Sequence, residues 1–339
     1  MSRSLDKGIL ASLEAENPKP AYNDISSLLT GMSEGELLEI ELLGKSHPLQ
    51  PGINYLRDGT AVAIPKLRLF QAFFVARQML DDYRNKDNLV GSYEAQAATT
   101  VVLLTDPEHL TAANTRKRLL ASSILEAGSP DVGALLRREK QFVDSLLTSR
   151  LYRHAKSPTL WSHRRWLLRQ FAAHGVVVDP RHDIKNIIMV AGTRHPRNYP
   201  AWHHARFLLG CHPQFAAPVA TDVKEFCLRN HADISSWSFL GSVIGAIGSR
   251  ETRCQMGSSF LTEILQITDS LRWKNESVWV FLRSVATAEF VSEGQFESIL
   301  AVNKRLASVT PKDDDQWRIL DSARRWCDAN RILGESTGS

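Results

Sequence analysis

Apolar and polar positions along most of this chain alternate with a helical period. After Trp161, Arg165 and Leu168 follow at i+4 and i+7, which places the three on one face of a helix. A second helix is predicted ahead of each such segment, because apolar residues recur at spacings of three and four: Phe142, Leu146 and Leu147; Ile184, Ile187, Ile188 and Ala191; Val223, Phe226 and Cys227; Phe260, Ile264, Leu265 and Leu271. The pattern predicts short helices joined by short polar links.

The same frame recurs around four tryptophans, Trp161, Trp202, Trp237 and Trp279. A fifth frame, over residues 109–117, has Ala113 in place of the tryptophan, and the successive spacings are 48, 41, 35 and 42 residues. A residue suited to an N-cap stands four positions before each tryptophan: Ser157, Asn198, Asp233 and Asn275. Helix pairs this short must stack on neighbours, so we predict an all-α fold: an α-solenoid, or crescent, of stacked antiparallel helical hairpins.

Prolines, glycines and breaks in the helical pattern predict four segments. They are an irregular N-terminal extension (1–60), a long buried helix that begins near Pro65 and leads into the solenoid (61–96), five hairpin repeats with a C-terminal capping helix (97–331), and a flexible tail (332–339).

Strand signals are few. Residues 60–64 and 176–178 are extended candidates, but neither is expected to build a sheet. The alternating acidic residues near position 40 are interpreted as the solvated face of a helix: Glu34, Glu36, Glu39 and Glu41.

Composition sharpens this picture through the distribution of charge. The 339 residues are 43% hydrophobic and 23% charged, which is typical of a globular protein and excludes disorder as the main state. The net charge is only +4, too small to indicate a nucleic-acid-binding protein. Residues 150–210, however, carry a net charge of +9 and seven of the eleven histidines, so the remainder of the chain carries −5. One basic block is therefore concentrated in the second and third repeats.

The cysteines and the termini indicate the compartment. The four cysteines include no Cys-x-x-Cys pair, which argues against a structural zinc site and for free thiols in a reducing environment. The N-terminus lacks the apolar core of a signal peptide, and the most apolar stretch is too short and too polar to span a membrane. We expect a soluble cytoplasmic protein.

The repeated frame resembles the protein prenyltransferase alpha-subunit repeat. The best matches are residues 159–166 and 198–204, residues 275–279 resemble the late repeats, and the resemblance covers about residues 97–331. Residues 103–107 and 156–166 resemble one subfamily most, the alpha-like partner in the type III geranylgeranyltransferase.

That resemblance implies a division of labour. The alpha subunit is a crescent around a beta subunit, which holds the zinc ion, the isoprenoid pocket and most catalytic groups; no cofactor or metal is expected in this chain. The implied partners are a beta subunit of the Rab geranylgeranyltransferase type, an acceptor protein with a C-terminal cysteine, and an isoprenoid diphosphate at the shared site. The implied activity is transfer of a geranylgeranyl group, with farnesyl the weaker alternative, and the chain would be inactive alone.

Candidate site residues follow from the same resemblance. Lys156 occupies the position of a lysine that reaches the diphosphate, although Ser157 and Pro158 replace the Asn-Tyr pair that usually follows it. Pro200 stands where farnesyltransferase has a histidine. The residues assigned to substrate or interface contacts are Arg197, Asn198, Tyr199, His163 and His203, and those assigned to repeat structure are Trp161, Arg164, Arg165, Trp202, Trp237 and Trp279.

Other interpretations stay open. Lys156 could be an ordinary solvent-facing loop lysine, and Arg164 and Arg165 are more simply explained as ties between hairpins than as substrate contacts. Because Ala113 replaces a tryptophan and Leu240 and Gly241 replace arginines, the chain could be a non-catalytic scaffold for protein–protein interaction. RNA binding by the basic block is disfavoured, since the tryptophans are expected to face inward and no base-reading pattern repeats.

Overall fold

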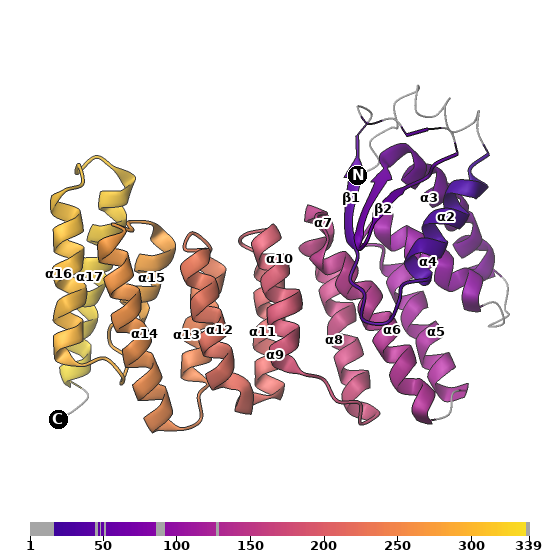
Figure 1. The fold of residues 1–339 in the computed structure, drawn as a ribbon. Coiled ribbons are helices and arrows are strands. Elements are labelled where there is room, and N and C mark those ends of the chain that lie inside the picture. The colour runs from indigo at the N-terminus through magenta and orange to yellow at the C-terminus, as the bar shows by residue number, and fades with distance from the viewer. Residues whose placement is uncertain are drawn as a thin grey trace. The chain divides into compact units, whose positions relative to one another are not determined.

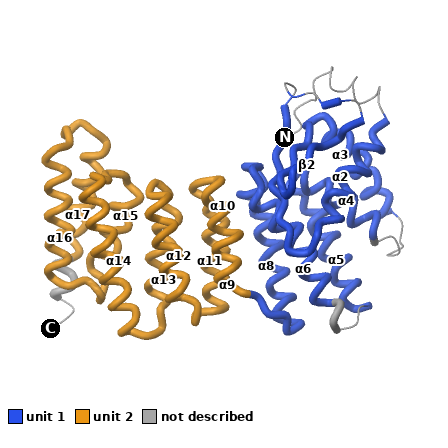
Figure 2. Tube along the Cα trace, viewed as in Figure 1, with its two compact units in different colours: residues 1–178 blue, residues 179–339 orange. Residues whose placement is uncertain are grey.

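The computed structural model describes residues 17–336, apart from residues 45–46, 48, 51, 86–91 and 127–128. The chain forms two compact units, residues 1–178 and residues 179–339, which Figure 2 shows in separate colours. Both units are built of helices, and the described residues contain a single three-stranded sheet. The prediction of an all-α helical-repeat fold is therefore confirmed, with the small sheet as an addition.

The first unit joins the sheet to the first two repeats (Figure 1). Its elements are α2 (Lys19–Thr30), β1 (Glu39–Leu43), β2 (Leu56–Asp58), β3 (Ala61–Pro65), α3 (Lys66–Asn85), α4 (Ser92–Thr105), α5 (Leu110–Glu126), α6 (Ser129–Thr148), α7 (Tyr152–Ala155) and α8 (Pro158–Ala173). Helices α4 and α5 pack together, as do α6 and α8, which makes two helical pairs.

The expectation that no segment here builds a sheet is wrong. The strand order is β1-β3-β2, with β3 parallel to β1 and antiparallel to β2. Ile40, Val62 and Ile64 are at most 1% exposed, so one face of the sheet belongs to the core. The prediction that the glutamates near position 40 form the face of a helix is also wrong, because Glu39 and Glu41 lie in β1. A period of two over five residues, with glutamate at alternate positions, pairs a buried face with an exposed one.

A long helix, α3, follows Pro65, but it is shorter and less buried than the segment predicted over residues 61–96, because residues 61–65 form β3 and α4 begins at Ser92. Leu69, Ala72 and Leu80 are at most 4% exposed, whereas Leu67 and Phe74 are 37% and 40% exposed. The helix is apolar around most of its circumference, but only one side of it is covered by the residues that the structure describes. The segment 1–60 also contains more regular structure than predicted, because α2, β1 and β2 lie within it.

The second unit continues as helical pairs (Figure 1). Its elements are α9 (Pro180–Asp183), a π-helical turn (Ile184–Ile188), α10 (Met189–Arg194), α11 (Tyr199–Cys211), a 3-10 turn (Pro213–Phe215), α12 (Ala216–Arg229), α13 (Ile234–Gly245), α14 (Arg250–Ser270), α15 (Glu276–Val285), α16 (Glu293–Ser308) and α17 (Asp315–Ser336). The C-terminal capping helix predicted near residues 316–330 corresponds to α17, which packs against α15 and α16.

Each repeated frame marks the start of the second helix of a pair: α5, α8, α11, α13 and α15. The predicted caps form at three of these starts, where Ser157, Asn198 and Asp233 accept hydrogen bonds from Leu160, Ala201 and Ser235. Asn275 occupies the cap position but its side chain accepts no helical N–H, so that part of the prediction is wrong. Its amide instead donates to the carbonyl of His231, 2.8 Å away in the preceding repeat.

Three of the frame tryptophans hold the link that precedes their helix, those before α8, α13 and α15. They donate from Nε1 to the carbonyl six residues earlier: Trp161 to Ala155 at 2.9 Å, Trp237 to His231 at 3.0 Å and Trp279 to Trp273 at 2.9 Å. All four tryptophans of the frame are at most 4% exposed. In all four repeats the large ring fills the core, and in these three its one polar atom also fixes the loop.

Candidate functional site

Lys156 lies at the end of α7, directly before the cap of α8. Its ammonium donates a hydrogen bond to the hydroxyl of Tyr152 at 3.3 Å and stands 4.5 Å from the centre of the same ring. Tyr152 is 62% exposed and Lys156 is half-buried. The cation is thus held near the surface of the first unit by a cation–π contact and a hydroxyl, which restricts a side chain that would otherwise move freely.

The candidate residues of the third repeat lie in the second unit, at the start of α11. Asn198 is fully buried and accepts a hydrogen bond from Ala201 at 3.3 Å, so it serves as the helix cap. Tyr199 is 62% exposed, and His203 is exposed one turn further along the helix. Arg197 is exposed with a φ of 59°, a left-handed conformation in the link ahead of the cap. Tyr199, His203 and Arg197 therefore present side chains that another molecule can reach.

His163 is placed differently from these surface residues. It is fully buried, and its Nε2 lies 3.3 Å from Oε1 of Glu139 in α6. Burial lowers the pKa of His163 despite the neighbouring carboxylate, which keeps the ring neutral. A substrate could not reach this side chain without opening the first unit, so the structure gives His163 a role in packing.

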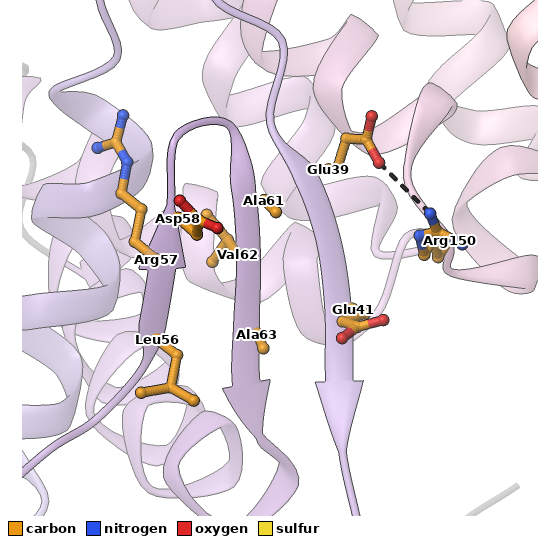
Figure 3. Close-up of a pocket in the computed structure, with 9 residues that line it drawn as sticks. All are labelled: Glu39, Glu41, Leu56, Arg57, Asp58, Ala61, Val62, Ala63 and Arg150. Atoms are coloured by element: carbon orange, nitrogen blue, oxygen red, sulfur yellow. Dashed lines mark ion pairs between the residues drawn. The ribbon is translucent and has the colours of Figure 1, made fainter.

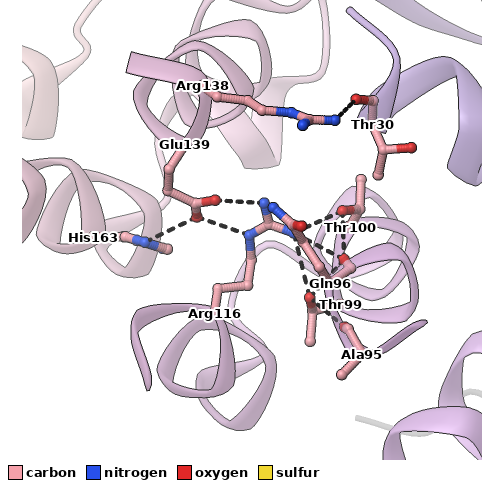
Figure 4. Close-up of polar contacts among 9 residues, drawn as sticks. All are labelled: Thr30, Ala95, Gln96, Thr99, Thr100, Arg116, Arg138, Glu139 and His163. Atoms are coloured by element: carbon pink, nitrogen blue, oxygen red, sulfur yellow. Dashed lines mark hydrogen bonds and ion pairs between the residues drawn. The ribbon is translucent and has the colours of Figure 1, made fainter. Parts of the chain in front are cut away.

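Glu139 also forms a bidentate ion pair with Arg116 of α5, whose Nε and Nη2 donate to the two carboxylate oxygens at 2.8 and 2.6 Å (Figure 4). The remaining guanidinium nitrogen donates to the hydroxyl of Thr100 at 2.7 Å and to the carbonyl of Gln96 at 3.0 Å, both in α4. Burial alone would raise the pKa of Glu139, but Arg116 and His163 hold that pKa far below its usual range. The arginine thus joins three helices, a cluster that the sequence pattern did not reveal.

A second buried ion pair uses Arg164. Its Nε donates to Asp144 of α6 at 2.6 Å, and Lys140 contacts the other oxygen of that carboxylate at 2.8 Å. Arg164 is fully buried. Its contacts support the interpretation of this arginine as a tie between helices. Asp144 lies 20 residues before Arg164 and Glu139 lies 23 residues after Arg116, so the sequence alone did not assign these partners.

Ties of another kind recur in the second unit, one position further along the frame. Arg206 of α11 donates to the hydroxyl of Ser238 in α13 at 2.9 Å, and Arg283 of α15 donates to Ser322 in α17 at 3.1 Å. Each arginine bridges the second helix of one pair to the second helix of the next pair. These basic residues of the frame therefore stabilise the stacking of one helical pair on the next.

Neither a metal centre nor a membrane span is found in the residues that the structure describes. No group of three or more histidine, cysteine or acidic side chains is arranged to hold a metal ion there. None of the helices in those residues is both long and apolar enough to cross a membrane. Cys227 and Cys327 are buried and unpaired, and burial raises the pKa of the Cys327 thiol to about 11.

Two family models match parts of this chain. Residues 136–171, which hold most of α6 together with α7 and most of α8, match the model of the protein prenyltransferase alpha subunit repeat. Residues 160–268 match the model of the ECM9 middle domain. Protein ECM9 of Saccharomyces cerevisiae is 28% identical over 203 residues, which cover 58% of this chain and 53% of the yeast protein. The chain thus spans about half the length of that relative.

Proposed function

We propose that this chain, which carries a protein prenyltransferase alpha subunit repeat, is the alpha-like subunit of a heterodimeric protein prenyltransferase in the cytoplasm. The observation that carries the proposal is the segment 136–171, because it matches that repeat and contains Lys156 within its fold. In this proposal the partner is a beta subunit of the Rab geranylgeranyltransferase type. The pair attaches a geranylgeranyl group to a cysteine of an acceptor protein, with farnesyl as the weaker alternative.

The chemistry assigns few tasks to this chain. The thiolate sulfur of the acceptor forms a bond to the first carbon of the isoprenoid while the carbon–oxygen bond to the diphosphate breaks, so negative charge grows on the diphosphate. A zinc ion in the beta subunit would lower the pKa of the thiol. Lys156 would place its cation beside the departing diphosphate, and its hold on Tyr152 orients that cation before substrate arrives.

The exposed residues at the start of α11 would serve a second task. Arg197, Tyr199 and His203 are reachable from outside the second unit, so we propose that they contact the beta subunit or the acceptor protein. Asn198 would act indirectly, since it is buried and holds the first turn of α11 in place.

Co-expression tests the proposal directly. The full chain is expressed with a Rab geranylgeranyltransferase beta subunit, and the complex is isolated by a tag on one subunit. Transfer of the isoprenoid group to acceptor protein is then measured from labelled geranylgeranyl diphosphate and, separately, from labelled farnesyl diphosphate. We expect a stable one-to-one complex with zinc-dependent transfer, and no transfer by either subunit alone.

Two other results have definite meanings. If the chain binds no prenyltransferase beta subunit, the proposal fails. If a complex forms but transfers neither isoprenoid, the scaffold interpretation replaces it. The buried arginines that tie helices together, such as Arg164, would serve a scaffold equally well.

A further inference from the structure

The outer face of the three-stranded sheet in the first unit is hollowed. The registers place Glu41, Ala63 and Leu56 in one row across the strands, and Glu39, Ala61 and Asp58 in the next. A depression of about 300 Å³ lies over these rows. Figure 3 shows the residues that line it. Because the middle strand contributes only methyl groups, the floor of the depression lies close to the backbone.

The rim of this depression carries three carboxylates, of which one is paired with an arginine among the residues that the structure describes. Glu39 lies 3.6 Å from the guanidinium of Arg150, which folds over the edge of β1. The side chains of Glu41 and Asp58 form no hydrogen bond or ion pair with any residue that the structure describes. Leu56 is 46% exposed beside them. The face therefore combines an apolar floor with two carboxylates that have no partner among the described residues, while the two arginines that line it, Arg57 and Arg150, pair with Glu36 and Glu39.

The opposite face of the same sheet is fully used. Ile40, Val62 and Ile64 are buried, and α3 and α6 pack against the strands. Domains are built of layers in which each sheet face is covered by helices or by another sheet. Within the described residues the outer face lacks such a layer, so it can accept one from another molecule.

The spacing of the carboxylates limits which helix fits. Glu41 and Asp58 lie on the two outer strands and one row apart, which separates them by about 12 Å, from strand spacings of ~4.8 Å and a rise of ~3.3 Å per residue. On a helix, side chains seven or eight residues apart share a face and are separated by about 10 to 12 Å. Two cations at that spacing would each meet one carboxylate.

We propose that this face docks a helix of a partner protein that presents two lysine or arginine side chains two turns apart. The aliphatic stems lie over Ala61, Ala63 and Leu56, as long basic side chains do on apolar surfaces. Their charged ends reach Glu41 and Asp58. This surface lies outside the repeats, so the inference stands apart from the proposed prenyltransferase function.

The test uses a labelled alanine-rich helical peptide of about 20 residues with two arginines seven positions apart, titrated with the full chain by fluorescence anisotropy. The double variant Glu41→Gln/Asp58→Asn should weaken binding about fivefold or more, from the loss of two ion pairs. Ala61→Tyr keeps both carboxylates but fills the depression, and it should weaken binding too.

Matched controls separate docking from charge attraction. Asp82→Asn/Glu126→Gln changes the net charge equally at exposed positions of α3 and α5, and it should leave the affinity within twofold. A peptide with the arginines nine positions apart presents them on opposite faces and should bind several-fold more weakly. The proposal is overturned if the chain does not bind the first peptide, if Glu41→Gln/Asp58→Asn binds like the native chain, or if the two peptides bind equally.

Discussion

The two units build the same frame with different chemistry at one position. Three residues after the aromatic position, the first unit has Arg116 and Arg164, both at most 4% exposed and both paired with acids of α6. The second unit has Ala205, Leu240 and Leu282 at that position, all buried. The frame thus accepts an ion pair or an aliphatic side chain at the same place. The tryptophan, the cap and the link define the repeat, while the buried charge is a local choice.

Buried ion pairs and aliphatic packing differ in what happens when one member is lost. An aliphatic side chain leaves a cavity, whereas an arginine without its acid remains a buried charge. The first unit should therefore be far more sensitive than the second to loss of a single acid in its core.

The largest expected effect comes from Glu139→Ala. This variant leaves Arg116 buried without its carboxylate and should lower the free energy of unfolding by about 3–5 kcal/mol. Urea unfolding followed by circular dichroism measures the change. Glu126→Ala, an exposed position of α5, serves as the control and should change stability by less than ~0.5 kcal/mol.

The double variant Arg116→Leu/Glu139→Leu sharpens the comparison, because it replaces the buried ion pair of the first unit with aliphatic side chains like those of the second unit. We expect it to recover more than half of the stability lost in Glu139→Ala. A double variant as unstable as Glu139→Ala would show that the ion pair is a requirement of the first unit.

A smaller effect should appear as a pH dependence of the first unit. Nε2 of His154 donates to the carbonyl of Leu104 at 2.8 Å, and burial lowers the pKa of His154 to about 4 from 6.5. Between pH 6.5 and 4, His154 is therefore protonated in the unfolded chain but mostly neutral in the folded chain. Stability is fully present above pH 6.5 and should fall as the pH drops, by about 3 kcal/mol in total near pH 4.

The variant His154→Gln can keep a donor near the same carbonyl but cannot titrate. Urea unfolding at intervals between pH 7 and 4 should show a shallower loss for this variant than for the native chain. Equal slopes would mean that His154 does not titrate differently in the folded and unfolded states.

The smallest predicted difference separates two cap positions of the second unit. Asp233 accepts from Ser235 at 3.0 Å and from the backbone of Arg197 at 3.3 Å, so it both caps α13 and ties two repeats. Asn275 ties its repeat to His231 without capping α15. Asp233→Ala should cost about 2 kcal/mol and Asn275→Ala about 1 kcal/mol, measured by thermal and urea unfolding. A larger cost for Asn275→Ala would contradict this division of roles.

The sequence was informative where the determinants are local. The tryptophan frames, the helix starts and three of the four caps depend on residues within one turn of each other, and they were predicted correctly. The sheet was missed because the parallel pairing of β1 with β3 joins residues that are about 22 positions apart. The cluster of Arg116 and Glu139 was missed for the same reason, since only packing brings α5 and α6 together.

In the candidate site, too, the local placement of residues was predicted but their contacts were not. The repeat motif places Lys156 at the end of its link, but the contact of its cation with Tyr152 could be found only in the structure. His163 stands next to the arginines of the motif, and the pattern gave no sign that it faces Glu139 in the core.

The central claim is that Lys156 supplies positive charge to prenyl transfer in a complex with a beta subunit. Single-turnover transfer of geranylgeranyl to acceptor protein, by purified complexes of the native chain, Lys156→Ala and the control Lys304→Ala, tests it most directly. Lys304 is an exposed lysine of α16. We predict that Lys156→Ala slows transfer about tenfold or more without loss of the complex, while Lys304→Ala matches the native rate. Equal rates for all three complexes would contradict the claim.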